Sequence, residues 1–273
     1  FLVARNTIKL AILNQFVNPQ NTELSIKTLL SAYDQLIELI SDNFSGPLQP
    51  HDIELYQQFL LYLDMLAFHI IRGYLAVEDP LLSLRKHKAH VENVIQVTGE
   101  DGNWRSIQYQ LLAEFIALIP LTILSEARNS KKNQRKFGGP LTVYFGGVTF
   151  SENGKYGSRV VLDPGLLLLR AANVQSMGIT GLQYPYMEGK ATSKLELLLE
   201  ARQEFEKHES SDDKAINTFV DYLSCLIGQV LLAQGSYEQA AMEFKASIAE
   251  TQRPTLLFEV MNKLLHCYKN LDD

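Results

Sequence analysis

Cysteine is scarce in this chain, and long apolar runs are absent. The two cysteines, Cys225 and Cys267, lie in helical patterns and are too far apart in sequence to form a metal-binding pair. We therefore expect reduced, buried thiols, which are usual in a reducing compartment such as the cytosol. The longest apolar run, Phe115 to Leu124, contains Pro120 and has about half the length that a membrane-spanning helix requires. We expect no transmembrane segment.

Basic charge is also in short supply. The 273 residues include 25 Lys and Arg against 31 Asp and Glu, which gives a formal net charge of −6. Nucleic-acid-binding proteins concentrate positive charge on one face, so this balance argues against that function. The chain begins at Phe1 without an initiator methionine, and we expect it to be part of a longer protein.

Motifs for nucleotide binding and for serine hydrolases are missing. Gly154-Lys155 resembles the end of a phosphate loop, but Thr149 stands where the first glycine belongs and Tyr156 where the magnesium ligand belongs. No Gly-x-Ser-x-Gly segment occurs. A cluster of carboxylates is interpreted as a solvated helix end. Its members are Glu204, Glu206, Glu209, Asp212 and Asp213.

Two histidines could in principle bind a metal ion. His87 and His90, with Glu92 nearby, are spaced so that their side chains share one side of a helix. A zinc site needs three or four ligands, and no further His or Cys lies at a supporting interval. We expect a partly exposed helix surface here and no metal.

A thiol nucleophile is the other chemical candidate. His266 adjoins Cys267, and helical hairpins could bring Cys225 close to both. Both cysteines lie in apolar rows, however, and buried thiols are usually inert. The sequence therefore predicts no catalytic residue, no cofactor and no enzyme.

One basic cluster has functional promise. Five cations within nine residues could contact an anionic membrane or an acidic partner. The cluster consists of Arg128, Lys131, Lys132, Arg135 and Lys136. The simpler interpretation is a solvated loop, because no apolar residue is interleaved before Phe137.

Apolar residues recur at intervals of three and four over most of the chain, which predicts helices. Asn21 or Thr22 is placed to cap one helix, and Asp79-Pro80 opens another. In the first half the expected helices span about 1–17, 24–40, 51–75, 79–95 and 104–118, and in the second half one spans about 166–178 and four more follow 193. The third is apolar on more than one face, so we expect it to be covered on several sides.

The helical pattern breaks between Glu126 and Pro164. Two β-branched and aromatic runs, Thr142 to Phe150 and Tyr156 to Leu162, flank Asn153-Gly154 there. A short β-hairpin and a long ordered loop both fit this stretch.

The clearest packing motif is a hairpin near residue 235. Ile227, Leu231 and Phe244 follow the spacing of a tetratricopeptide repeat. We expect Gly228 and Ala240 to face each other between the two helices, and Gly235 to end the first helix in a left-handed conformation.

These patterns predict an all-α fold, an α-solenoid of antiparallel tetratricopeptide-like hairpins with one irregular loop or β-hairpin insertion. The expected parts are helical hairpins in 1–127, a basic linker and insertion in 128–162, and further hairpins in 163–273. Together they would form one continuous superhelix that binds other proteins.

The second half also carries four motifs in a characteristic order. They are Asp163-Pro164-Gly165 followed by Ala171-Ala172, then Leu199-Glu200-Ala201-x-x-x-Phe205, then Gly235-x-Tyr237-x-x-Ala240-x-x-x-Phe244, and last Leu264-Leu265-x-Cys267-x-x-x-Leu271-Asp272. This order, over about 159–273, resembles the foie gras domain of TRAPP complex subunit 11. A weaker resemblance to the earlier helices of that family runs from Asp79-Pro80-Leu81-Leu82 to His90. The related large TRAPP subunit ten stays open as an alternative to subunit 11.

The resemblance implies a non-catalytic scaffold. Its expected partners are other TRAPP subunits and, indirectly, a Rab GTPase in transport between endoplasmic reticulum and Golgi. The implied location is cytoplasmic, at the periphery of Golgi and ER-Golgi membranes. Two alternatives stay open: an adaptor that binds an extended peptide in a groove, and an enzyme whose site is assembled from scattered residues.

Overall fold

The computed structural model describes residues 2–18, 21–44, 52–77, 79–98, 102–119, 148–152, 155–159, 163–175, 193–207, 214–250 and 254–271. These residues are helical apart from one two-stranded ribbon, in agreement with the predicted all-α class. The chain divides into two compact units. Unit 1 consists of Phe1–Arg105 with Gly178–Met187, and unit 2 of Ser106–Met177 with Glu188–Asp273.

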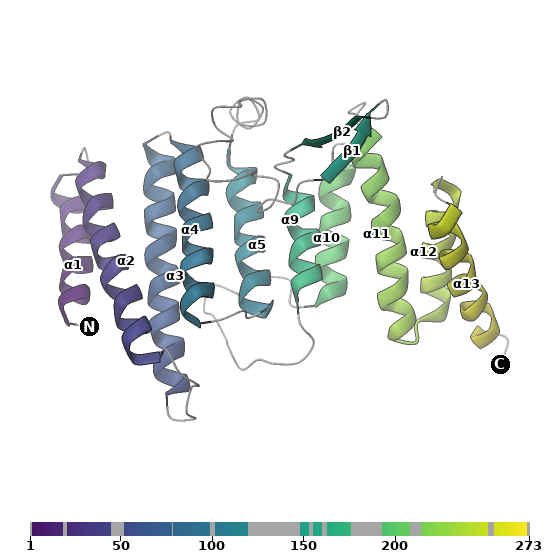
Figure 1. The fold of residues 1–273 in the computed structure, drawn as a ribbon, viewed down its shortest axis with the longest axis horizontal. Helices are drawn as coiled ribbons and strands as arrows, with labels where there is room; N and C mark the ends of the chain where they lie inside the picture. The colour runs from purple at the N-terminus through teal and green to yellow at the C-terminus, as the bar shows by residue number, and fades with distance from the viewer. Residues whose placement is uncertain are drawn as a thin grey trace. The chain divides into compact units, whose positions relative to one another are not determined.

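In the part that the structure describes, unit 1 is built from four consecutive helices, each of which packs against the next (Figure 1). They are α1 (Leu2–Val17), α2 (Thr22–Phe44), α3 (Ile53–Ala76) and α4 (Pro80–Thr98). Buried aliphatic side chains at helical spacing supply the core, among them Leu29, Leu36 and Ile40 on α2 and Leu63 and Ile70 on α3. The hydrophobic pattern therefore placed these helices correctly.

The starts of α2 and α4 are capped by side chains. Asn21 Oδ1 accepts a hydrogen bond from the backbone N–H of Leu24 at 3.2 Å. Asp79 Oδ1 accepts one from the N–H of Leu82 at 3.1 Å. Both caps satisfy donors that the first helical turn leaves unpaired, as predicted, and Asn21 rather than Thr22 caps α2.

Helix α3 is the one described helix that is long and apolar enough to cross a membrane by length and composition, over Glu54–Ala76. The expectation of no transmembrane segment rested on uninterrupted apolar runs, and polar residues such as Asp64 and His69 interrupt this helix. Helices α2 and α4 both pack on it, and Asp64 is buried in its middle. Leu55, Tyr62 and Met65 are exposed, so it is covered on fewer sides than its sequence predicts.

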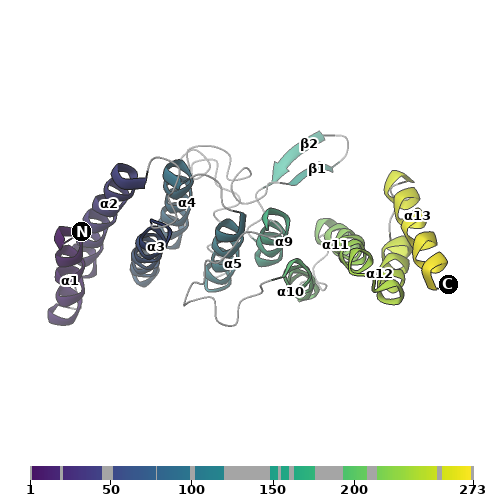
Figure 2. The same ribbon diagram turned by 90° about the horizontal axis from the view of Figure 1, so that it is seen from below.

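Among the described residues, unit 2 contains most of α5 (Gly102–Ala117) and five later helices. These are α9 (Pro164–Val174), α10 (Lys194–Glu206), α11 (Lys214–Ala233), α12 (Tyr237–Glu250) and α13 (Pro254–Leu271). Helices α9 and α10 form one antiparallel hairpin, α11 and α12 form a second, and α13 packs on α12 (Figure 2). Helix α9 ends at Val174, four residues before the predicted end, because Gln175 turns to an extended conformation.

The helices of the first hairpin begin at well-formed caps. Asp163 Oδ1 accepts from the N–H of Gly165 at 2.8 Å, and Pro164 occupies the first helical position, where its missing N–H costs nothing. Ser193 and Glu196 form a reciprocal capping box at the start of α10.

The ribbon consists of β1 (Val148–Glu152) and β2 (Lys155–Arg159), which pair antiparallel with Val148 opposite Arg159 and Glu152 opposite Lys155. It lies in the stretch where the sequence left a hairpin and an ordered loop open. Asn153 and Gly154, proposed as its turn, lie outside the described residues.

Candidate functional site

The two histidines considered as metal ligands are core residues. His87 and His90 are 0% and 2% exposed, so the expectation of a partly exposed helix surface is wrong for them. His87 lies three residues after Leu84 and four before Val91, both buried, and so shares their inward-facing row on α4. Glu92 points outward instead and pairs with Lys88 at 3.0 Å.

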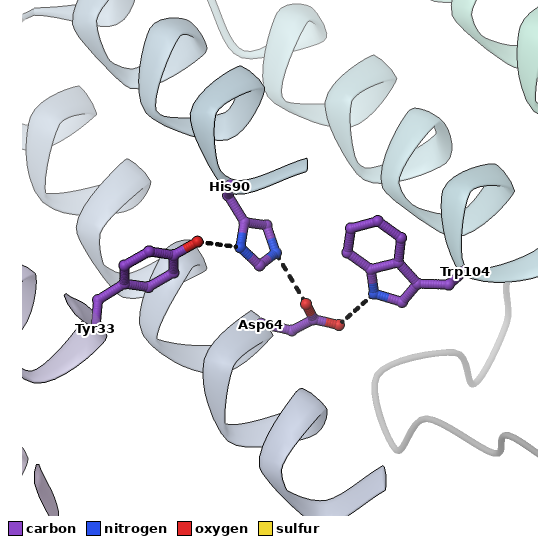
Figure 3. Close-up of polar contacts among 4 residues, drawn as sticks. All are labelled: Tyr33, Asp64, His90 and Trp104. Carbon is purple, nitrogen blue, oxygen red and sulfur yellow. Dashed lines mark hydrogen bonds and ion pairs between the residues drawn. The ribbon is translucent and has the colours of Figure 1, made fainter. Parts of the chain in front are cut away.

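A buried polar network is centred on His90 (Figure 3). The Tyr33 hydroxyl lies 2.9 Å from His90 Nδ1, and His90 Nε2 lies 2.9 Å from Asp64 Oδ1. The other carboxylate oxygen of Asp64 accepts a hydrogen bond from the indole N–H of Trp104 at 3.0 Å. The four side chains come from α2, α4, α3 and the first turn of α5, so the network ties together elements far apart in sequence.

One assignment of hydrogens satisfies every contact in this network. The Trp104 indole can only donate, so Asp64 serves as its acceptor. His90 then donates from Nε2 to the second oxygen of Asp64, which leaves Nδ1 free to accept from the Tyr33 hydroxyl. Each donor thus has an acceptor, which is the condition under which burying a polar cluster stabilises a fold rather than weakening it.

The order Tyr, His, Asp is also that of a proton relay, so the network has a catalytic and a structural interpretation. Burial decides between them. Asp64 is fully buried and His90 nearly so. A catalytic base must come within hydrogen-bond reach of a substrate, and these groups are enclosed by packed helices. Among the described residues, no group of three or more His, Cys, Asp or Glu could hold a metal ion. We therefore interpret the network as a structural clamp.

Sequence reasoning missed this clamp although it contained a signal. Asp64 is a carboxylate in the middle of an otherwise apolar helical row, and buried carboxylates are rare unless paired. Tyr33 lies in the apolar row of its helix, and Trp104, the single tryptophan, lies at the start of another helix, so neither position by itself indicates a polar contact. A carboxylate among the apolar residues on the buried face of a helix is the pattern that predicts such a network.

Tyr33→Phe tests the hydroxyl contact through its pH dependence. Desolvation by burial raises the pKa of the Tyr33 phenol above its ordinary value, while a hydrogen bond from Asn93 acts in the opposite direction. At neutral pH we expect the variant to lose about 1 kcal/mol of unfolding free energy with the hydrogen bond. Above about pH 10 only the unfolded state releases this proton, so the wild-type advantage falls by up to about 1.4 kcal/mol per pH unit.

The measurement is urea unfolding of both proteins between pH 8 and 11, followed by circular dichroism. Titrations common to the two chains cancel in the difference between their unfolding free energies. A difference that stays constant with pH would show that Tyr33 is not buried as described.

A contact that occurs twice lies in unit 2. In each hairpin, a glycine on the first helix faces a phenylalanine ring on the second helix. A Cβ added to Gly165 would lie 2.9 Å from Phe205 Cε2, and one added to Gly228 would lie 2.7 Å from Phe244 Cε1. The ring that fills the space at Gly228 therefore belongs to Phe244, which corrects the predicted pairing with Ala240. Ala240 is buried one turn earlier on α12.

The predicted left-handed end of the first helix and the predicted buried thiols are confirmed. Gly235 has φ +77°, the left-handed conformation that ends α11. Cys225 and Cys267 are free and fully buried, and desolvation raises the pKa of both thiols. His266 is exposed and hydrogen-bonds to Asn270, so the structure does not join it to a buried thiol.

The carboxylate cluster is partly engaged in ion pairs. Glu206 lies 3.8 Å from Arg202, whose guanidinium also binds both oxygens of Glu243 on α12 at 2.8 Å. Glu204 pairs with Lys207. The remaining predicted residues lie outside the described ranges: Glu209, Asp212 and Asp213, and the basic cluster Arg128, Lys131, Lys132, Arg135 and Lys136.

Comparison with known proteins identifies one family. Residues 56–177 match the family described as Foie gras liver health family 1, and the predicted resemblance to the foie gras domain is confirmed. No curated protein and no solved structure matches the chain. The matched segment runs from α3 through α9 and includes Asp64, His90 and Trp104 of the clamp.

The position of the resemblance differs from the predicted one. It was placed mainly in 159–273, whereas the match covers that range only up to residue 177. The Asp163-Pro164-Gly165 and Ala171-Ala172 motifs lie inside the match, and the later hairpin motifs lie outside it. Those later motifs specify close helix packing, which many helical repeats share.

Proposed function

We propose, since residues 56–177 belong to the foie gras family, that the chain is a non-catalytic scaffold subunit of a TRAPP-type tethering complex in transport between endoplasmic reticulum and Golgi. Its work in this proposal is to hold other subunits in fixed positions and to act on a Rab GTPase only indirectly. The family match carries the proposal. The clamp in unit 1 is enclosed within the fold, which supports a non-catalytic role.

Exposed apolar faces favour a permanent assembly over a peptide adaptor. Helix α1 leaves a set of large apolar side chains in solvent: Leu2, Val3, Leu10, Leu13, Phe16 and Val17. The only charged residues on this helix are Arg5 and Lys9. Grooves that clamp extended peptides are usually rich in Lys, Arg and Asn, whereas a continuous apolar face is typical of a lasting subunit contact.

In the proposed arrangement, the helical hairpins stack into an α-solenoid. From α1 to α4 in unit 1 and from α9 to α13 in unit 2, each helix packs on the next, which is how solenoid repeats bury apolar faces that a single hairpin cannot cover. Such a framework offers long exposed surfaces to several partners at once, as a scaffold requires.

Affinity capture tests the scaffold proposal. Tagged chain incubated with cell extract is expected to recover other TRAPP subunits, identified by mass spectrometry. Leu13→Glu places a charge in the α1 face and should reduce the recovery, whereas Lys27→Glu, at an exposed position of α2, serves as the matched control. Recovery of a chaperone alone would favour the peptide adaptor, and recovery of no TRAPP subunit contradicts the proposal.

The basic cluster is proposed to contact anionic membranes at the Golgi. Reversing the charge of Lys131, Lys132 and Arg135 is expected to leave the circular dichroism spectrum unchanged and to weaken co-sedimentation with vesicles of mixed phosphatidylserine and phosphatidylcholine. Vesicles of phosphatidylcholine alone provide the control. Equal binding by the original and charge-reversed chains would remove the cluster from the proposed membrane contact.

A further inference from the structure

Two carboxylates lie within reach of one guanidinium in unit 2. Arg202 of α10 donates from Nη1 to both carboxylate oxygens of Glu243 on α12, at 2.8 Å each. Its Nε lies 3.8 Å from Glu206, one turn further along α10. The Glu243 side chain is 18% exposed and that of Glu206 48%, so the contact with α12 is the more sheltered of the two. An arginine presents five N–H donors, and either carboxylate can therefore hold it.

Each of the two hairpins is held rigid by its own glycine-phenylalanine contact. A Cβ on Gly165 would lie 2.9 Å from the Phe205 ring, and one on Gly228 would lie 2.7 Å from the Phe244 ring. The two helices of each hairpin are thus in close contact at these positions, and closely packed interiors deform little. The α9·α10 and α11·α12 hairpins therefore behave as two rigid bodies.

The joint between the two hairpins is built differently. Helix α11 packs on α10 before it and on α12 after it, and Figure 2 shows α11 between them. Apolar packing of α10 on α11 is non-directional, so it permits small rotations of one hairpin against the other. The ion pair from Arg202 to Glu243 joins α10 directly to α12 and requires a defined geometry. It therefore fixes the angle between the hairpins about α11.

We propose that the ion pair between Arg202 and Glu243 is a latch that sets the angle between the two hairpins, and that Glu206 holds the Arg202 guanidinium when the latch is open. Because the guanidinium keeps a carboxylate in both arrangements, opening does not leave the cation unpaired. A joint with two such arrangements is a conformational switch, and its opening changes the spacing of any partners bound to the two hairpins. The latch does not depend on membership of a TRAPP complex, so either idea can fail without the other.

Distances between spin labels on the two hairpins test the latch. Gln203→Cys on α10 and Ala246→Cys on α12 are exposed labelling positions, whereas the native cysteines are buried, so the chain without these substitutions should take up no label. Double electron–electron resonance of the labelled chain is expected to give one narrow distance distribution. Arg202→Gln or Glu243→Gln should shift it to longer and broader distances. Raising the salt concentration should shift the original latch in the same direction, because salt screens the ion pair.

Two further variants distinguish a latch from an ordinary ion pair. Glu206→Gln removes the carboxylate of the open state, so the closed distance should persist to higher salt. The exchange of Arg202→Glu with Glu243→Arg places the cation on α12 and should restore the narrow distribution, because the pair is again complete. Lys207→Gln is the matched control, since Lys207 pairs with Glu204 three residues earlier and its loss should leave the distance unchanged.

A second pair of labels, on Asn173→Cys in α9 and Gln203→Cys in α10, reports within one hairpin and should be unaffected by every substitution. A distance between the hairpins that neither Arg202→Gln nor Glu243→Gln changes overturns the latch, as does a charge exchange that fails to restore the distribution. A change in the distance within the hairpin also overturns it, because the ion pair would then hold the hairpin rather than the joint. A Glu206→Gln chain that opens at the same salt concentration as the original removes Glu206 as the alternative partner, and with it the two-state joint.

Discussion

Asp64→Ala is expected to lower the free energy of unfolding by about 2–6 kcal/mol, because two buried donors lose their acceptor at a cost of about 1–3 kcal/mol each. The Asp64 carboxylate accepts hydrogen bonds from His90 and Trp104, and its removal leaves two buried N–H donors without that acceptor. Trp104 is the only tryptophan, so its fluorescence reports unfolding at the clamp itself during a urea titration.

Asp34→Ala provides the control, since Asp34 is exposed on α2 and its loss should change stability by less than about 0.5 kcal/mol. A double-mutant cycle of Asp64→Ala with Trp104→Phe, followed by circular dichroism, should be non-additive by about 0.5–3 kcal/mol because the two groups touch. A loss below about 1 kcal/mol for Asp64→Ala would contradict the structural role that burial assigns to the clamp.

Gly228→Leu is expected to destabilise the chain by about 1–3 kcal/mol through overpacking. Even the first added carbon would lie 2.7 Å from the Phe244 ring, so the two helices must move apart or the ring must change rotamer. Ala240→Leu should have a cost of the same kind, because Ala240 is fully buried on α12. Thermal melting followed by circular dichroism measures both.

A second pair of variants separates overpacking from backbone strain. Gly228→Ala combined with Phe244→Leu should be more stable than the sum of the single changes predicts, because the smaller side chain makes room for the new methyl group. Gly235→Ala should cost about 1–2 kcal/mol through its left-handed backbone, with nothing within 4 Å to overpack, and Phe244→Leu should not rescue it. An unchanged melting temperature for Gly228→Leu would count against the close contact.

The helices and their caps could be predicted because their causes are local. Apolar spacing placed α2 and α4, and Asn21 and Asp79 cap donors only three residues away. The left-handed Gly235 was likewise a local inference from one residue type at a helix end.

The clamp could not be predicted in the same way. Tyr33 lies 57 residues from His90 in sequence, and Asp64 lies 26 residues from His90 and 40 from Trp104. Periodicity shows which way a side chain points on its own helix, but it does not show which other helix meets it there. A histidine in an inward row was therefore taken for a surface residue.

The family resemblance was likewise predicted in part: the family was predicted, but its position in the chain was not. The order of motifs indicated a foie gras domain, yet the match lies at 56–177 and not in the hairpins that suggested it. A small residue such as Gly228 is needed wherever two helices approach closely, so such motifs indicate packing more reliably than ancestry.

The sequence by itself determined that this protein is helical, where most helices begin, and that its cysteines would be buried. Only the tertiary structure decided that Phe244 fills the space at Gly228, that four distant side chains share one buried network, and that Arg202 meets Glu243 on α12. The reason is physical. Hydrogen bonds and hydrophobic spacing within a helix act over three or four residues, whereas burial depends on which surfaces meet once the whole chain has folded.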